Sequence, residues 1–533
     1  MKARRWWVEI VLVGATVAGG VSLAQPGVLG HGRPRGRLQH LALPLSTPEE
    51  QGMESFRLAE AVAFLTRLRD DYRPHQVIVV RHGRRVLDVT LYPFSQGLRH
   101  DIASVGKMIT GTLVGIAIDR GLIASVDEPV LSFFPDRQIA NRDARKEAMT
   151  LAHLLAQRSG IYHGDDGSCY AESVAMRASP DWVQWILDRP MAEQPGGAWY
   201  YSNANLHLAA GVLAQATGMS PLDFARRYLF GPLHISDVVW EADPQGINCG
   251  DGGQHLLPLD LAKLGQLYLD GGVWEGRRVV SPEWIARATS RFPGPLPSGW
   301  PAELSIGFHW VITPDSREAG GSGGQIVRFY PAEDVVLVLV AGGGTPYSGC
   351  SNPVALADPL YSGYIEPAVR SSAPLPPNPA GVAELAARIS AASLSNEGAP
   401  HPVPALPSTA LAISGKRYDL EPNSLGLQWL SLSFPPGGEA VLRIDGSVDD
   451  PEIEARIGLD DVRRISTGEF GLPVAAKGWW TDSSRFVLLF DEFALYTYYR
   501  ATMLFNGDNL TVAVEDLACP GGPLITFGGT MQR

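Results

Sequence analysis

The sequence is poor in cysteine, in clustered basic residues and in long apolar runs, and each scarcity excludes a class of protein. Its four cysteines, at positions 169, 249, 350 and 519 of 533 residues, are too far apart for a zinc knuckle or a Cys-x-x-Cys redox pair. They leave open either up to two disulfides or buried unpaired thiols. Charged residues make up 19% of the chain and the net charge is −12, without a basic stripe, so we expect no nucleic-acid partner. Hydrophobic residues make up 45%, which is typical of globular domains, and no apolar run after Leu23 is long enough to cross a membrane.

The N-terminus carries a segment that is typical of exported proteins. Three basic residues within the first five precede a mostly apolar run, Trp6–Leu23, and small residues before Gln25 suit a signal-peptidase cut after Ala24. We therefore predict that residues 1–24 are a signal peptide and that the protein is periplasmic or extracellular. Glu9 interrupts the apolar run, so the alternative is a retained anchor that associates the protein with a membrane.

The apolar periodicity predicts an α+β domain over residues 44–370. Helical patterns occur at 48–68 and from 127 to 287. Strand-like runs predict strands at 76–81, 86–91, 305–312, 325–330 and 335–341. Strands at both ends of a helical insert indicate an antiparallel sheet that is flanked by helices and closed from the two ends of the domain.

The last third of the chain has a different character. Residues 371–408 are rich in proline and predict a linker with one short helix. Over 409–533, strand patterns such as Gln428–Phe434 and Arg485–Phe490 alternate with turns, which indicates a second, antiparallel β domain, either a barrel or a sandwich. We expect its Trp479-Trp480 pair to be core rather than a ligand platform.

A first candidate for chemistry is Ser104-Val105-Gly106-Lys107, at the start of a predicted helix that ends near Gly121. Residues i and i+3 share a helical face, so the Lys107 amine can approach the Ser104 hydroxyl. A lysine that burial keeps partly neutral can remove the proton that makes a serine hydroxyl a weak nucleophile. The alternative is a helix-capping serine with a solvated lysine.

A second candidate is Tyr201-Ser202-Asn203, which follows Pro195-Gly196-Gly197 and opens another predicted helix. Tyr201 and Asn203 flank one residue and can point into one cleft, where a phenol beside a lysine would relay a proton. We expect Asn203 to orient Lys107 and the substrate. The alternative is an ordinary helix cap with aromatic packing.

A third candidate is the glycine-rich segment Ala319-Gly320-Gly321-Ser322-Gly323-Gly324-Gln325, which leads into a strand. Glycine lets a substrate or a helix approach the backbone closely. A main-chain N–H here would supply a second oxyanion donor beside the Ser104 N–H. The alternative is a plain hairpin.

Together the three segments resemble the Ser-x-x-Lys, Tyr-x-Asn and Lys-Thr-Gly-like motifs of the serine β-lactamase and penicillin-binding-protein superfamily, in the same order. The resemblance extends from about Pro44 to Pro367. It implies a β-lactamase/transpeptidase-like fold and acyl transfer through Ser104, with the Ser322 N–H as second oxyanion donor and with Gly321 and Gln325 at the substrate. It implies no cofactor and no metal, so His163-Gly164-Asp165-Asp166 is expected to be a loop at the cleft mouth rather than a metal site.

The resemblance is closest to the class C-like branch, which includes esterases and 6-aminohexanoate-dimer hydrolase. The family's third-motif cation, which holds a substrate carboxylate, is Ala319 here, although Arg317 or Arg328 would compensate if either faced the cleft. We therefore expect an esterase or amide hydrolase of small-molecule or peptide-like substrates. The alternatives are a β-lactamase or D-alanyl-D-alanine carboxypeptidase, and a non-catalytic envelope-binding protein. The β-rich tail resembles the lipocalin-like appendages of such hydrolases and would pack, shape substrate access or contact an envelope polymer.

Overall fold

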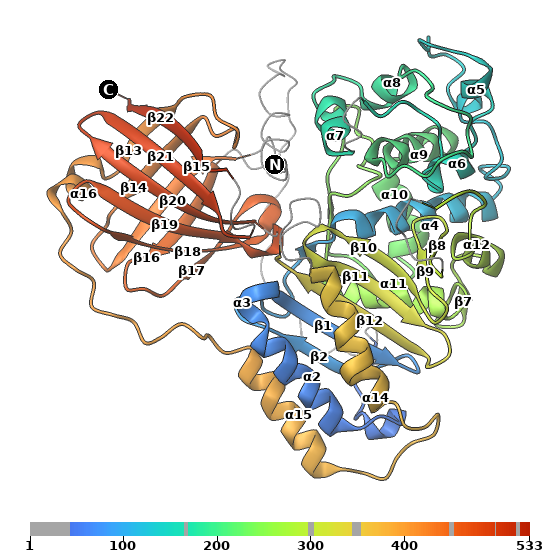
Figure 1. The fold of residues 1–533 in the computed structure, drawn as a ribbon, viewed down its shortest axis with the longest axis horizontal. Coiled ribbons are helices and arrows are strands. Elements are labelled where there is room, and N and C mark those ends of the chain that lie inside the picture. Colours follow the sequence, from blue (N-terminus) through green and yellow to red (C-terminus); the bar gives the residue numbers. More distant parts are fainter. Residues whose placement is uncertain are drawn as a thin grey trace.

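The computed structural model describes residues 43–164, 169–296, 303–343, 353–446, 452–495, 497–518 and 523–532. They form an α+β N-terminal domain and a β-barrel C-terminal domain (Figure 1). The α-helices of the N-terminal domain are α2 (Ser55–Arg67), α3 (Arg69–Tyr72), α4 (Gly106–Asp119), α5 (Ala144–Glu147), α6 (Leu151–Leu155), α7 (Cys169–Arg177), α8 (Trp182–Leu187), α9 (Asn203–Thr217), α10 (Pro221–Ala225), α11 (Pro258–Leu269), α12 (Pro282–Ala288), α13 (Ala357–Leu360), α14 (Glu366–Ala368) and α15 (Pro379–Ala392).

The strands of the N-terminal domain are β1 (Pro74–Arg81), β2 (Arg84–Thr90), β3 (His100–Asp101), β4 (Val239–Trp240), β5 (Gln254–Leu256), β6 (Val273–Trp274), β7 (Arg277–Arg278), β8 (Ser305–Ile306), β9 (Val311–Ile312), β10 (Arg317–Gly321), β11 (Gln325–Tyr330) and β12 (Val335–Ala341). In the described part of the chain, seven of them form a sheet in the order β2-β1-β12-β11-β10-β9-β8. Each pair of neighbouring strands in it is antiparallel, and Val77 of β1 lies opposite Leu339 of β12. The prediction of an antiparallel sheet that closes from both ends of the domain is confirmed.

The central strands are buried on both faces, and their side chains divide between two cores. Val77 and Val79 of β1 belong to the core under α2 and α15, whereas Ile78 and Val80 belong to the core around α4 and α11. This division follows from the two-residue repeat of a strand, which turns successive side chains to opposite faces. Helices therefore cover the sheet on both faces.

The predicted linker helix is part of the N-terminal domain. α15 lies side by side with α2 (Figure 1), and its Leu385 and Ala392 are buried in the same core as Leu58 and Leu65 of α2. The segment that connects the two domains therefore begins after α15 and not at residue 371. Proline content alone marked the whole of 371–408 as linker, but the apolar face of the helix needs a partner.

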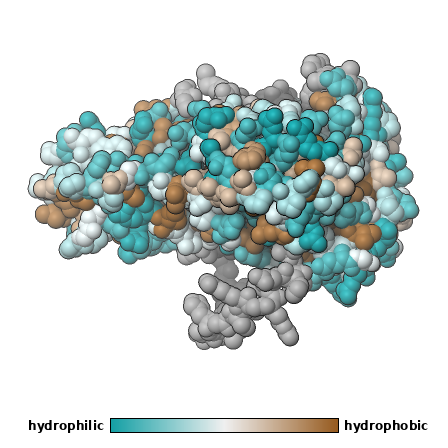
Figure 2. Space-filling view, turned by 90° about the horizontal axis from the view of Figure 1, so that it is seen from below, coloured by the Kyte–Doolittle hydropathy of each residue, from teal (hydrophilic) through white to brown (hydrophobic). Residues whose placement is uncertain are grey.

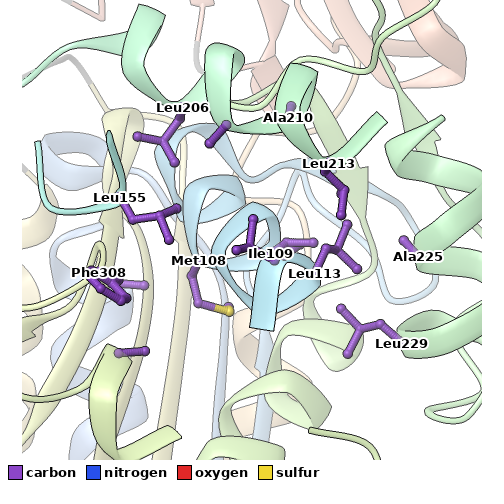
Figure 3. Close-up of a cluster of buried hydrophobic side chains, with 14 of the residues drawn as sticks. Met108, Ile109, Leu113, Leu155, Leu206, Ala210, Leu213, Ala225, Leu229 and Phe308 are labelled. Carbon is purple, nitrogen blue, oxygen red and sulfur yellow. The ribbon is translucent and has the colours of Figure 1, made fainter. Parts of the chain in front are cut away.

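α4 is the central helix of the N-terminal domain and carries the predicted nucleophile at its start. Its residues from Gly106 to Ala117 are all buried, which fits a helix that is apolar on every side. In Figure 3, Met108, Ile109 and Leu113 of α4 are surrounded by side chains from other helices, among them Leu206 and Leu213 of α9. This packing fixes the position of the helix that presents Ser104.

The C-terminal domain begins with α16 (Ser408–Ile413) and is a barrel rather than a sandwich. Its strands are β13 (Lys416–Leu420), β14 (Trp429–Ser433), β15 (Glu439–Asp445), β16 (Glu452–Gly458), β17 (Arg464–Thr467), β18 (Pro473–Trp480), β19 (Arg485–Glu492), β20 (Thr497–Asn506), β21 (Asn509–Asp516) and β22 (Ile525–Met531). Neighbouring strands pair in the order β16-β15-β14-β13-β22-β21-β20-β19-β18-β17, and β16 also pairs with β18, which closes the sheet. Of the predicted Trp479-Trp480 pair, Trp480 packs against the barrel core and Trp479 is exposed.

One end of the barrel contacts the N-terminal domain close to β3. Two short 3-10 turns of the barrel, Glu469–Gly471 and Phe493–Leu495, provide the contact. Phe493 packs edge-on against His75 and Phe94 of the N-terminal domain. Arg73 forms an ion pair with Asp491 at the end of β19. The barrel therefore lies against the strand that leads into Ser104.

The surface carries no large apolar band on the face in view. Figure 2 shows hydrophobic residues scattered among hydrophilic ones. Within the described ranges, every helix is too short or too polar to span a bilayer. The N-terminal segment predicted as signal peptide or anchor lies outside the described residues.

Candidate active site

Ser104 lies at a sharp turn between β3 and the central helix. Ala103 has a φ of 46°, which is uncommon for a residue with a Cβ. The Ala103 N–H donates to Asp101 Oδ1 over 2.8 Å and so holds the turn. Backbone strain of this kind persists only where the surrounding structure fixes it, and it gathers at functional sites. The chain then continues through the 3-10 turn η3 (Ala103–Val105) into α4, as the helix prediction required.

Two side chains of the predicted motifs converge on the Ser104 hydroxyl. Lys107 Nζ donates to Ser104 Oγ over 2.8 Å, and Tyr201 OH donates to the same oxygen over 2.6 Å. Lys107 Nζ also donates to the Asp251 carbonyl oxygen over 2.7 Å and lies 4.9 Å from the centre of the Tyr201 ring. Lys107 has no exposed surface, so it is not the solvated lysine of the alternative interpretation.

Burial shifts the pKa values of the two candidate proton acceptors, Lys107 and Tyr201, in opposite directions. It lowers the pKa of the Lys107 amine to about 8, because an ammonium loses hydration in the interior. It raises the pKa of the Tyr201 phenol, and the hydrogen bond to Ser104 only partly opposes this. Near neutral pH the amine therefore loses its proton far more readily than the phenol. This arrangement favours Lys107 over Tyr201 as the group that accepts the serine proton.

The loop that carries Tyr201 is held by two residues that the sequence motifs did not include. Gln157 Oε1 accepts from the Ser202 N–H over 3.1 Å and from Asn205 Nδ2 over 2.8 Å. The Ser202 hydroxyl donates to the buried Glu172 carboxylate over 2.7 Å and accepts from the Asn205 N–H, which caps α9. Gln157 and Glu172 are distant from Tyr201 in the sequence, so no spacing pattern could have identified them.

Asn203 makes a different contact from the one expected. Its side chain is buried, and Nδ2 donates to the Ser173 hydroxyl of α7 over 2.8 Å. Among the described residues no hydrogen bond joins Asn203 to Lys107, and Asn203 Oδ1 has no hydrogen-bond partner. The prediction that Asn203 orients Lys107 is therefore revised, because the helix turns the amide toward α7.

The glycine-rich segment approaches the nucleophile at Gly321. A Cβ built on Gly321 would lie 3.0 Å from the Ser104 nitrogen and 2.9 Å from the Ile102 carbonyl oxygen. Only glycine lets β10 pass this close to the start of the nucleophile helix. Ser322 follows directly and begins the 3-10 turn η6 (Ser322–Gly324). The role of its N–H as second oxyanion donor stays a prediction.

Gln325 supports this loop from behind. Its side chain has no exposed surface, and Nε2 donates to the Ser322 carbonyl oxygen over 3.1 Å and to the Ala341 carbonyl oxygen over 2.8 Å. Gln325 Oε1 accepts from the Ala341 N–H. This revises the prediction that Gln325 contacts substrate, since its amide joins the ends of two strands.

Neither arginine near the third motif replaces the missing cation. The Arg328 guanidinium bonds to Glu318 and Asp358, and Arg328 is buried. The Arg317 guanidinium donates to the carbonyl oxygens of Thr289, Thr313 and Ser316. Both charges are therefore engaged in structural contacts.

His309 is a further residue beside Tyr201 that no motif indicated. The ring centres of His309 and Tyr201 are 6.5 Å apart, and Gln157 Nε2 lies 3.3 Å from His309 Nε2. Gln157 Oε1 is occupied by two N–H donors, so its Nε2 must donate and His309 Nε2 must accept. Burial and the nearby Lys107 charge lower the pKa of His309 well below its usual value. His309 is therefore a neutral imidazole in the wall of the site.

The predicted loop at the cleft mouth is described only in part. His163 Nδ1 lies 2.6 Å from Glu172 Oε1, and the ring stacks on Tyr200 at 4.0 Å. Asp165 and Asp166 lie outside the described residues. Of the cysteines, Cys249 is a buried free thiol, and burial raises its pKa, while positions 350 and 519 are outside the described residues.

The helix-flanked antiparallel sheet and the Ser104, Lys107 and Tyr201 cluster define a serine hydrolase of the β-lactamase and penicillin-binding-protein superfamily. Residues 65–358 match the Beta-lactamase family model, so the chain belongs to that family. The predictions of superfamily, fold class and enzyme class are confirmed.

Curated relatives include hydrolases of two kinds. The chain is 26% identical over 320 residues to the 6-aminohexanoate-dimer hydrolase of Paenarthrobacter ureafaciens. The aligned region covers 56% of this chain and 79% of the relative. The chain is 27% identical over 315 residues to Esterase EstB of Burkholderia gladioli. That aligned region covers 56% of this chain and 70% of the esterase. The solved octameric penicillin-binding protein homologue from Pyrococcus abyssi is 14% identical, covers 88% of this chain and 99% of its own, and has a TM-score of 0.47.

Proposed function

We propose that this protein cleaves an ester or amide bond through an acyl-enzyme on Ser104. The observation that carries the proposal is the pair of hydrogen bonds on Ser104 Oγ, from Lys107 Nζ at 2.8 Å and from Tyr201 OH at 2.6 Å. A serine with a proton acceptor and a second donor on one oxygen has the contacts that an activated nucleophile needs.

In the first step the neutral Lys107 amine takes the Ser104 proton while Oγ attacks the carbonyl carbon. Negative charge develops on the carbonyl oxygen, between the Ser104 and Ser322 N–H groups. Tyr201 remains protonated and passes a proton toward the leaving alcohol or amine as the tetrahedral intermediate collapses. Lys107 gives up its proton to restore the phenol. Water, activated by the same pair, then releases the acid and regenerates Ser104.

The nature of the bond is supported by what the site lacks and by the relatives. Ala319 stands where β-lactamases have a cation, and Arg317 and Arg328 are engaged elsewhere. The relatives named above are a 6-aminohexanoate-dimer hydrolase and an esterase. These points favour small ester or amide substrates over carboxylate-bearing β-lactams and D-alanyl peptides.

The test is the intact mass of residues 25–533 after reaction with a fluorophosphonate, with Ser104→Ala as control. We expect one adduct on the wild-type chain and none on the variant, after which panels of esters, amides and nitrocefin would identify the bond. Nitrocefin turnover or a stable penicillin adduct would favour the β-lactamase or carboxypeptidase alternative. A folded wild-type chain without an adduct would contradict the proposal and favour the non-catalytic binding protein.

We infer export from the N-terminal segment alone, because its basic start, apolar run and Ala24 site fit a signal peptide. Expression of the full chain in a bacterium, followed by mass spectrometry of the mature N-terminus, tests this. A mature chain that begins at Gln25 is expected, and an uncleaved chain in the membrane fraction would indicate the anchor instead.

A further inference from the structure

Lys107 lies at the inner end of a row of charged side chains. Apart from Lys107, the members of this row belong to none of the three motifs. Lys107 Nζ donates to the backbone carbonyl of Asp251, whose own carboxylate is buried and lies 3.4 Å from the Arg177 guanidinium. Arg177 is 4.0 Å from Glu241, and Glu241 is 3.5 Å from His255 Nε2. Two carboxylates and one guanidinium thus alternate in sign behind the amine.

The barrel covers the outer end of this row of charged side chains. The Phe470 ring lies 4.8 Å from the His255 ring, and Arg99 donates to the Phe470 carbonyl oxygen over 2.9 Å. Phe470 has a φ of 55° at the turn between β17 and β18, which turns it out of the strand path toward the N-terminal domain. With the barrel docked, the charges lie in an interior of low polarity, where they act more strongly than in water.

The two charged side chains nearest to Lys107, Asp251 and Arg177, affect the pKa of its amine in opposite directions. The Asp251 carboxylate favours the ammonium form of Lys107, whereas the Arg177 guanidinium disfavours it; burial, the largest cause, also disfavours it. The other groups that face Lys107 are Ser104 from η3, Tyr201 from the loop before α9, Cys169 from α7 and His309 from the loop before β9. The backbone of Asp251 holds the amine in place, and its side chain brings Arg177 beside it.

We propose that Asp251 and Arg177 are positioning residues that hold Lys107 against Ser104 and act on its amine with opposite electrostatic signs. The inference rests on the proposed role of Lys107 as proton acceptor. It adds two side chains from separate segments, α7 and the loop before β5, to the machinery of the site. Both act through Lys107.

The test is the pH dependence of the labelling rate with a fluorophosphonate probe in the full chain. The wild-type rate should rise with pH as Lys107 loses its proton, and the midpoint of that rise is the measured quantity. Asp251→Asn keeps the backbone carbonyl and removes the negative charge, so its midpoint should fall, by about one pH unit. Arg177→Gln removes the positive charge, so its midpoint should rise by a similar amount. The double variant should return close to the wild-type value.

Asp260→Asn is the matched control. Asp260 is as buried as Asp251, at 3% exposed, and also bonds to a cationic side chain, Lys263. Its loss should affect stability to a similar degree without moving the midpoint. Midpoints that coincide in Asp251→Asn and Arg177→Gln, or that move in the same direction, would overturn the inference.

A second measurement separates this inference from the proposed function. The ¹³Cε resonance of Lys107, assigned by its loss in Lys107→Arg, can be titrated whether or not the probe reacts. If the wild-type chain forms no adduct, the proposed function fails. Opposite displacements of the Lys107 titration would then still support the electrostatic pair, and unchanged titrations would refute it.

Discussion

The two domains fill their interiors in opposite ways. The N-terminal domain buries ionisable groups throughout its core, including Lys107, Asp251 and the pair His207 and Asp243. The barrel interior is hydrocarbon: a cavity of about 60 Å³ inside it is lined by side chains such as Leu442, Ala501 and Val512. Its charges lie mostly outside, in exposed pairs such as the one between Arg443 and Glu454.

The difference indicates which domain performs the chemistry. A buried charge costs several kcal/mol unless it is paired, so a fold keeps one where it is used or where a partner offsets the cost. In the barrel, Asp491 is a buried acid at the end that contacts the N-terminal domain, and its ionic partner is Arg73 of that domain. Asp491 of the barrel thus uses its buried charge for attachment, whereas Lys107 and Asp251 of the N-terminal domain lie beside the nucleophile.

The largest effect should come from Lys107→Ala. Without the proton acceptor, acylation of Ser104 should slow by about 10²–10⁴-fold, measured in single turnover with an activated ester, while the fold remains intact. Leu442→Ala in the barrel should show the reverse, a loss of about 2–5 kcal/mol of stability with an unchanged acylation rate. A near-normal rate for Lys107→Ala would remove this residue from the mechanism.

Arg73→Ala tests the attachment of the barrel. The substitution leaves the Asp491 carboxylate buried without its cation, and burial already raises its pKa. We expect a loss of about 3–5 kcal/mol in the free energy of unfolding, measured by urea denaturation. Arg57→Ala breaks an ion pair that is about half exposed on both sides and should cost no more than about 1 kcal/mol. Equal losses in the two variants would mean that the buried pair does not stabilise the docked state.

The pH dependence of acylation should reflect Lys107. The amine accepts a proton only when it is neutral, and its pKa is lowered to about 8. The rate should therefore rise about tenfold for each pH unit below that value and level off above it. Stopped-flow measurements from pH 6 to 10 check this. A plateau that extends down to pH 6 would show that the amine is not the acceptor.

The smallest effect should come from filling the barrel cavity. Ala501→Leu adds hydrocarbon to a space that is already apolar and should stabilise the chain by about 0.5–1 kcal/mol, measured by thermal unfolding, without a change in acylation. Leu504→Ala, at an exposed position of the same strand, should change stability by less than about 0.5 kcal/mol. A destabilised Ala501→Leu would mean that the cavity walls cannot accept a larger side chain.

Local spacing explains what the sequence could predict. Strand-like runs identified β1, β2, β11 and β12, and the i, i+3 spacing brought Lys107 to Ser104. Tyr201 was predicted as a site residue because it belongs to the Tyr-x-Asn motif.

Contacts between distant segments explain what could not be predicted. Gln157, Asp251 and the α7 residues Glu172 and Arg177 reach the site from three separate stretches of the chain, and only the packed fold brings them together. Motif membership also does not show where a side chain points, and for this reason Gln325 faces the sheet interior.

The pairing of β1 with strands from the far end of the domain has a consequence during synthesis. Arg73 and Gly342, whose side chain and carbonyl oxygen are hydrogen-bonded, are 269 positions apart in the chain. At a translation speed of about 5–20 residues per second, Gly342 emerges from the ribosome roughly 13–54 s after Arg73, the residue that precedes the β1–β2 hairpin. Throughout that interval the hairpin exposes an unpaired edge and an apolar face, so the nascent chain requires protection from aggregation until β12 and α15 emerge.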